Sequence, residues 1–213
     1  LRQILGDLTL NSSHSPVQIG SVGGSARLAS NHGPVNVERV EGELSAQNSH
    51  GPVCVGSVGR GAAVRNSFGP IDLGRVGGEV TVESDRGPVH LGSAGGRVTV
   101  RASRADVLIE DPAGEVLAEN SRGAITVRPS APVQAAYTLT NSRGNISVEL
   151  PDGSGVGVQG FVRRGRVETD LPLEVSANGQ QGQSVSGQLG RGGAALQVEI
   201  DDGNLMLRRR PLA

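Results

Sequence analysis

The stretch "NSHGPVCVGSV", Asn48–Val58, contains the phrase that decides the fold, because the chain returns to it at a fixed interval. Related phrases begin at Asn66 and Asn120. A nine-residue unit, roughly G-x-V-x-V followed by four turn residues, repeats in register from residue 6 to residue 131, and two units make one eighteen-residue period. The glycines of the eighteen-residue phrase are Gly33, Gly51, Gly69, Gly87 and Gly123, with Ala105 in the remaining slot.

The spacing inside each unit predicts a short strand and a corner. Apolar residues at unit positions three and five alternate with polar ones, which is typical of a strand with one buried face. A glycine every nine residues supplies the backbone freedom for a sharp turn. One such strand cannot bury its apolar side alone, but stacked copies can. We therefore predict an all-β, single-domain β-solenoid over residues 1–213, with two short strands per 18-residue coil and rungs about 4.8 Å apart.

The repeat also predicts which residues form the core and the corners. We expect the asparagines of one corner to stack, with their amides bonding to each other and to backbone groups of the turn. The predicted corner asparagines are Asn48, Asn66 and Asn120. The predicted buried columns are Val17, Val35, Val53, Ile71, Val89, Val107, Ile125; Ile19, Val37, Val55, Leu73, Leu91, Ile109, Val127; Leu44, Val80, Val98, Val116; Leu28, Val64, Val82, Val100; and Val22, Val40, Val58, Val76.

The sequence of residues 132–213 predicts an irregular continuation of the solenoid and a C-terminal β cap. The segment "NSRGNISVEL" from Asn141 repeats the phrase with a displacement of three residues. The later segments "GRVETDLPLEV" from Gly165 and "GGAALQVEIDDGNLMLRRR" from Gly192 predict longer strands. We expect these strands to finish the stack and to cover its last rung, because an uncovered rung leaves an open sheet edge.

Composition excludes several classes of function. All 20 basic residues are arginine, which excludes lysine Schiff-base chemistry and a Walker-type phosphate loop. The formal net charge is −1 with both signs interspersed, so no nucleic-acid partner is predicted. No apolar run is long enough for a transmembrane helix, and we expect no membrane span in this chain. The single cysteine, Cys54, excludes an internal disulfide and leaves the compartment undetermined.

The repeated Asn-Ser-x-Gly-x-Ile/Val phrase, the segment "VETDLPLEV" and the ending "GQLGRGGAALQVEIDDGNLMLRR" resemble a bacterial family of putative adhesins, whose function is unknown. The resemblance covers most of the chain. It implies a repetitive β-solenoid, attached in many members to proteins of the cell envelope or membrane, and hence an envelope or extracellular location. It implies no catalytic residues and no cofactor.

The residue before the repeated glycine forms one outward column along the predicted stack. Its first members are His14, His32 and His50, and two neighbouring imidazoles could share a zinc or nickel ion. A structural zinc site takes four ligands, and no cysteine or carboxylate occupies a matching slot. We therefore predict no metal and no cofactor, with these histidines as weak candidates and ordinary corner residues as the favoured interpretation.

The later members of this column are arginines, Arg86, Arg104, Arg122 and Arg143. Like charges on adjacent rungs repel unless carboxylates or an outside anion compensate them. Two interpretations stay open: compensation inside the chain, or contact with an anionic partner such as a glycan or a protein surface. The carboxylates near enough in sequence to compensate are Glu83, Glu110, Asp111 and Glu119.

A third set, Cys54, Asp72 and His90, suggests a Cys-His-Asp nucleophilic site. The predicted spacing argues against it, because Cys54 and His90 would lie two rungs apart with the carboxylate between them. The sequence therefore favours a non-catalytic scaffold or an adhesion-like binding module. The alternatives are a self-assembling solenoid that pairs end to end, and an enzyme that acts on polysaccharide through Asp and Arg residues on one sheet face.

Overall fold

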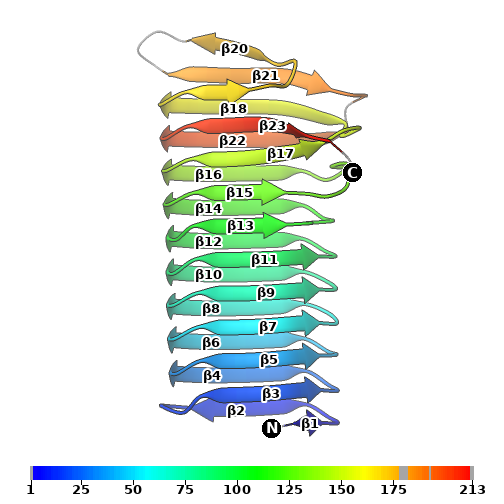
Figure 1. Cartoon of the computed structure of the whole chain (residues 1–213), viewed down its shortest axis with the longest axis vertical. Helices are drawn as coiled ribbons and strands as arrows, with labels where there is room; N and C mark the ends of the chain where they lie inside the picture. Colours follow the sequence, from blue (N-terminus) through cyan, green and yellow to red (C-terminus); the bar gives the residue numbers. More distant parts are fainter. Residues whose placement is uncertain (1, 178–181, 192, 212–213) are drawn as a thin grey trace.

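The computed structural model is a β-solenoid whose coils stack into a straight rod, as Figure 1 shows. It describes residues 2–177, 182–191 and 193–211. An 11-stranded sheet contains odd-numbered strands alone, and a 12-stranded sheet contains the even-numbered strands together with β21. Along most of the rod the chain passes from one sheet to the other at each corner. The predicted fold class, with two short strands in each coil, is confirmed.

Each strand is four to seven residues long over most of the rod and longer near its end. The first sheet, in chain order, contains β1 (Gln3–Ile4), β3 (Val17–Val22), β5 (Val35–Val40), β7 (Val53–Val58), β9 (Ile71–Val76), β11 (Val89–Ala94), β13 (Val107–Glu110), β15 (Ile125–Arg128), β17 (Ile146–Pro151), β19 (Val167–Thr169) and β23 (Leu205–Arg210). The second sheet contains β2 (Leu8–Ser12), β4 (Ala26–His32), β6 (Leu44–His50), β8 (Ala62–Phe68), β10 (Val80–Arg86), β12 (Val98–Arg104), β14 (Val116–Arg122), β16 (Tyr137–Arg143), β18 (Val156–Arg164), β20 (Glu174–Ala177), β21 (Gln183–Leu189) and β22 (Ala194–Asp202).

The pairing register follows the sequence period. Val89 pairs with Val107 in parallel strands, an offset of eighteen residues, and this offset holds through the pair of β13 and β15. On the next coil Val116 pairs with Tyr137, an offset of twenty-one. The displacement of three residues predicted at Asn141 is therefore confirmed, and the additional residues lie in the corner between β15 and β16.

The core is a narrow double layer of branched aliphatic side chains between the two sheets. Every residue of the predicted buried columns is 5% exposed or less, which confirms the period-two interpretation of the strands. Tyr137 is the one large aromatic residue of this layer, and it is 2% exposed. Its hydroxyl donates a hydrogen bond to the carbonyl of Pro112 at 3.4 Å. Burial, with a smaller contribution from the negative charge of Asp111, raises its pKa to about 12.

The buried asparagines hold the corner through backbone carbonyls. The Asn66 amide nitrogen donates to the carbonyls of Gly51, at 2.9 Å, and Gly69, at 3.1 Å. Each amide thus joins its own rung to the one before it. The prediction that the amides bond to one another is wrong, because the amide oxygens of Asn48, Asn66 and Asn141 have no hydrogen-bond partner among the described residues.

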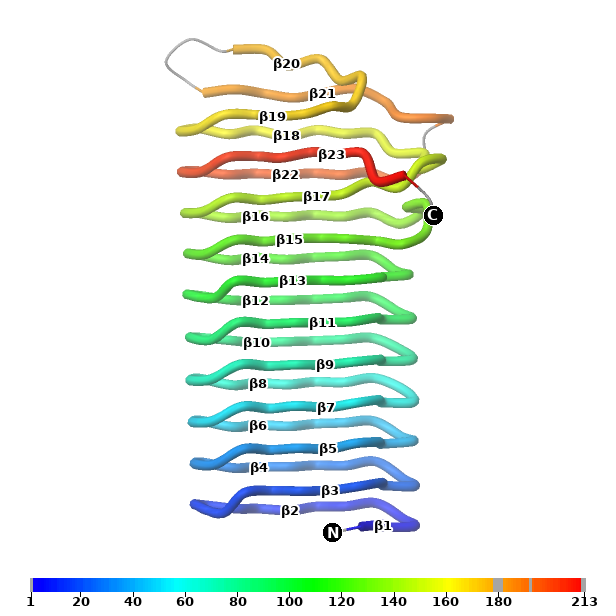
Figure 2. Tube along the Cα trace, viewed as in Figure 1, coloured from blue at the N-terminus to red at the C-terminus, as the bar shows by residue number. Residues whose placement is uncertain are grey.

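The order of rungs departs from the order of the chain near the C-terminus. The last two strands, β22 and β23, do not cover the end of the stack as predicted. Instead β22 lies between β16 and β18, and β23 lies between β17 and β19, with parallel pairing on both sides (Figure 2). We call this pair the inserted rung. Strands β18, β19, β20 and β21 lie beyond the inserted rung.

The two ends of the rod differ. At the N-terminal end, β2 is the first strand of its sheet and has a neighbour only on one side, β4. At the other end, β21 turns back to pair antiparallel with β18, and β20 pairs antiparallel with β21. We call β18–β21 the cap. It breaks the parallel series, so the end of the rod presents a different edge from its beginning (Figure 1).

Candidate functional site

One corner of the rod carries a continuous column of aromatic and basic side chains. It is the corner at which the even-numbered strands end, on the left in Figure 1. Parallel pairing in register places His32 beside His50 and His50 beside Phe68. The rings of His14, His32 and His50, which we call the histidine stack, lie face to face with centroids 4.9 Å and 4.7 Å apart and planes within 2° of parallel. The predicted adjacency of these histidines is therefore present.

The histidine stack is not arranged to chelate a metal. Two nitrogens bonded to one zinc ion at about 2.0–2.1 Å lie at most about 4.2 Å apart, with their lone pairs directed at the ion. Parallel rings 4.7 Å apart direct their lone pairs side by side instead. Among the described residues, no group of three or more His, Cys, Asp and Glu side chains could hold a metal ion.

Beyond the stack, the column becomes cationic. The Phe68 ring lies 4.8 Å from the His50 ring, and the Arg86 guanidinium lies 5.1 Å from the Phe68 centroid on the next rung. Arg104, Arg122 and Arg143 follow on successive rungs. All four arginines are exposed. We call Arg86, Arg104, Arg122 and Arg143 the arginine row.

Three of the four carboxylates that lie near this row in the sequence are engaged elsewhere. Glu83 forms an ion pair with Arg65, and Glu119 forms one with Arg101, at 3.4 Å. Glu110 is bonded to His90. No member of the arginine row forms an ion pair with another residue that the structure describes.

The inserted rung ends the arginine row. Asp202 of β22 pairs in register with Arg143 on one side and Arg164 on the other. Its carboxylate lies 3.7 Å from the Arg164 guanidinium. The sequence period did not place Asp202 or Arg164 in this column, because Asp202 is separated from Arg143 by fifty-nine residues.

A second column, on the outer face of the first sheet, contains Cys54, Asp72 and His90. Asp72 lies between the other two, as predicted. His90 Nδ1 lies 3.1 Å from an Asp72 oxygen, and His90 Nε2 lies 3.1 Å from a Glu110 oxygen of the next coil. Partial burial lowers the pKa of His90, but hydrogen bonds and charge from Glu110 and Asp72 outweigh it and raise that pKa overall.

This arrangement ties coils together and does not activate the thiol. Burial, and then the neighbouring Asp72 charge, raise the pKa of Cys54. A nucleophilic cysteine needs the opposite shift. Glu110 was not predicted as a partner of His90. The signal that could have found it is the eighteen-residue offset from His90 to Leu108, two residues before Glu110.

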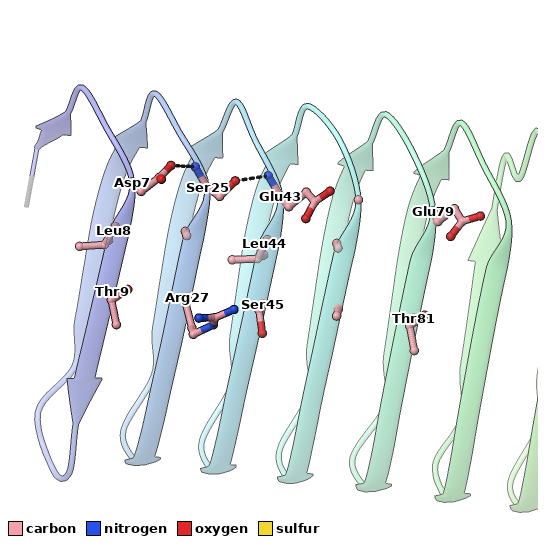
Figure 3. Close-up of a pocket in the computed structure, with 14 residues that line it drawn as sticks. Asp7, Leu8, Thr9, Ser25, Arg27, Glu43, Leu44, Ser45, Glu79 and Thr81 are labelled. Carbon is pink, nitrogen blue, oxygen red and sulfur yellow. Dashed lines mark hydrogen bonds between the residues drawn. The ribbon is translucent and has the colours of Figure 1, made fainter.

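A shallow groove crosses the second sheet near the N-terminal end. Figure 3 shows Asp7, Glu43 and Glu79 along the corner where the strands begin. Asp7 accepts a hydrogen bond from the Ser25 backbone nitrogen at 2.7 Å, and the Ser25 hydroxyl accepts one from the Glu43 nitrogen at 3.2 Å. The three carboxylates occupy alternate rungs, about 9.6 Å apart at rung spacing. This equals or exceeds the widest separation used for inverting glycoside hydrolysis, about 6.5–9.5 Å.

The comparisons with known proteins are few. No family model matches the sequence, and no curated protein matches it. Among solved structures, the fold is similar to that of a putative cell adhesion protein from Clostridium sporogenes, with 13% sequence identity, a TM-score of 0.29 and 70% of this chain covered. The match spans 56% of that protein's length. Within the described part of this chain, no helix has the length and apolar character that crossing a membrane requires.

Proposed function

We propose that this chain is a non-catalytic, adhesion-like scaffold of the bacterial cell envelope, and that its arginine row binds an acidic polysaccharide. One observation carries the proposal: four exposed guanidinium groups lie on consecutive rungs without an ion-pair partner among the described residues. A planar guanidinium forms paired hydrogen bonds with a carboxylate, so the row suits a ligand that carries carboxylates at intervals.

The spacing favours a polymer over a single small anion. Rungs are about 4.8 Å apart, so the row extends about 14 Å along the rod in three steps. The positions that directly precede these arginines carry Asp85, Ser103, Ser121 and Ser142, so only one of the four is acidic. An extended polyuronate can place several carboxylates along this line at once, and several weak contacts then act together.

The backbone beneath the row is rigid, which favours a binding role. Each arginine ends a strand that is paired in parallel on both sides. Buried Asn120 and Asn141 donate hydrogen bonds to corner carbonyls next to the row, at 2.8 Å and 2.7 Å. A ligand therefore meets side chains whose backbone positions are already ordered, and this reduces the entropy lost on binding.

Calorimetric titration of the full chain with alginate, a carboxylated polysaccharide, tests the proposal. We expect binding that weakens steeply as sodium chloride is raised, because the contacts are between exposed charges. Changing the whole row to glutamine should weaken binding by about tenfold or more. A matched control removes four exposed arginines outside the row, namely Arg27, Arg60, Arg75 and Arg191. An equal loss in the control, or no binding of alginate at low salt, contradicts the proposal.

One observation favours self-assembly as a second candidate. Among the described residues, β2 pairs on one side, with β4, and Leu8 and Leu10 are half-buried there. Two copies could pair through this edge, whereas the cap gives the other end a different geometry. Light scattering over a hundredfold range of concentration tests this candidate. A mass that stops at the dimer supports pairing at the N-terminal end, and a constant monomer mass contradicts it.

A further inference from the structure

The inserted rung assembles a second surface that differs from the rest of the rod. On the outer face of the second sheet, Gln197 of β22 lies between Thr138 of β16 and Gln159 of β18. Ser186 of β21 lies beside Gln159 on the far side. These four side chains come from separate parts of the sequence, and only the order β16-β22-β18-β21 brings them into one row.

This surface carries two neighbouring shallow depressions that are open to solvent and together form a shallow trough. They measure about 540 Å³ and about 490 Å³ and share Gln159, Ser186 and Gln197 in their walls. One contains Phe161, and the other contains Gly157 and Ala195, which pair with each other. Since residues 157, 159 and 161 alternate on one face of β18, the trough runs along the strand, with an aromatic ring at one end and a floor of small residues at the other. We call it the cap trough.

The polar groups of the cap trough are almost all uncharged. Its walls carry amides and hydroxyls, and Glu199 is the one ionisable side chain among the described residues that line it. The outward column that contains Glu199 carries ion pairs nearer the N-terminus, such as Arg65 with Glu83 and Arg101 with Glu119. An amide both donates and accepts hydrogen bonds, as a sugar hydroxyl does, whereas a charged group favours a charged partner.

Phe161 supplies an apolar surface in this polar setting. It is half-buried and points outward from β18. The other phenylalanine, Phe68, has His50 stacked against it and Arg86 over its ring. Phe161 makes no such ring contact with any residue in the described part of the chain. Its ring is therefore available to the apolar C–H face of a pyranose, and the nearby amides are available to the hydroxyls at the sugar's edge.

From this geometry we infer that the cap trough binds an uncharged oligosaccharide. Phe161 stacks against one sugar, Gln159 and Gln197 bond to hydroxyls of the same sugar and the next, and the floor at Gly157 and Ala195 leaves room for the chain to continue. This site is separate from the arginine row. The row attracts carboxylates through charge, and the cap trough recognises neutral sugars through hydrogen bonds and stacking.

The test uses the full chain and a panel of neutral hexasaccharides of glucose, xylose, mannose, galactose and N-acetylglucosamine. Binding is detected by saturation-transfer NMR and its Kd is measured by calorimetry. We expect at least one hexasaccharide to bind, with a Kd that changes less than about twofold between about 50 mM and about 500 mM sodium chloride, because no charge pairing is involved. Phe161→Ala and Gln197→Ala should each weaken that binding about tenfold or more.

Two controls separate this site from the rest of the rod. Phe68→Ala removes the other phenylalanine and should leave the Kd unchanged. The variant lacking the arginine row should also bind the neutral sugar as the wild type does, so failure here and failure of the alginate proposal are distinguishable. Circular dichroism must show that each variant keeps the wild-type Tm. The inference is overturned if no neutral hexasaccharide binds, or if Phe161→Ala binds as tightly as the wild type.

Discussion

Strands β2–β15 and strands β16–β23 build the same rod under different rules. In the first region each strand pairs with the strand eighteen residues away, so neighbours in the chain are neighbours in space. In the second region β16 pairs with β22, fifty-nine residues away, and the cap packs on the far side of the inserted rung. A repeat therefore specifies the spacing of rungs wherever it is present, but it does not specify the order in which late rungs are stacked.

The inserted strand β22 matches its neighbour β18 in length and in its corner residue. Strands β18 and β22 both contain nine residues and match each other over eight register pairs, whereas β16 has seven residues. Ile200 and Val162 occupy the corner column that holds Asn120 and Asn141 in the rungs below. The corner column therefore changes from amides to apolar side chains where the second region departs from the order of the chain.

The largest expected effect comes from the inserted rung. Ile200 is 0% exposed, and Ile200→Ala should lower the free energy of unfolding by about 2–5 kcal/mol because it leaves a cavity. Among the described strands, the cap pairs with the rest of the rod through β22 and β23. We therefore expect hydrogen exchange to accelerate in strands β18–β21, while β3–β11 keep their protection.

The matched control is Ile109→Ala in β13, which is also 0% exposed. A cavity there should loosen its own coil and the two adjacent coils, because each repeat contacts only its neighbours. If Ile200→Ala leaves the cap as protected as it is in the wild type, the cap does not depend on the inserted rung and the contrast between the two regions is lost.

A smaller effect is expected at the corners that both regions share. Gly51 has φ +107°, and a Cβ there would lie 2.6 Å from the Gly33 carbonyl oxygen of the preceding coil. Gly51→Ala should therefore cost about 1–3 kcal/mol of folding free energy, measured by urea unfolding. Gly61→Ala is the control, because neighbouring rungs carry Glu43 and Glu79 at this position and a Cβ meets only one atom, at 3.3 Å. Equal losses in the two variants would show that backbone conformation does not limit this corner.

The sequence predicted what depends on local spacing and failed where distant segments meet. The eighteen-residue period, the valine columns and the shift of three residues at Asn141 follow from alternation along one strand, and all are confirmed. The inserted rung follows from a competition among strands for one edge, and no local pattern records the outcome. The cap trough shares this origin, because Gln197 meets Gln159 only once β22 is inserted.

The membership of the column that carries the histidine stack and the arginine row was also predicted only in part, because local spacing does not record contacts with distant segments. Its members from His14 to Arg143 follow the period, and the structure places them on successive rungs. Asp202 joins it only through the inserted rung. The corner contacts were predicted in part: the bonds from the amides to backbone groups are present, whereas the bonds between amides are not. Spacing places Asn48 beside Asn66 but does not set the direction of their amides, which turn toward carbonyls.

The smallest expected effect on folding stability is at His90 of β11, on the outer face of the first sheet. Its pKa is raised in the folded state by Glu110 and Asp72, so the folded protein binds this proton more tightly than the unfolded chain does. The resulting stabilisation is fully present below the unfolded pKa of about 6.5 and is lost as the pH rises through the raised folded pKa. Because the ion pairs of His90 are well exposed, the contribution should stay below about 1 kcal/mol.

Thermal unfolding of His90→Gln measures this contribution. The Tm difference between wild type and variant should be larger at pH 5.5 than at pH 8.5, because only the protonated imidazole pairs with both carboxylates. The control is the same substitution in the Asp72→Asn, Glu110→Gln background, where the rise toward low pH should disappear because both partners of the imidazolium are neutral. A His90→Gln difference that is flat with pH in the wild-type background would mean that the contacts of His90 with Asp72 and Glu110 add nothing to the stability of the stacked coils.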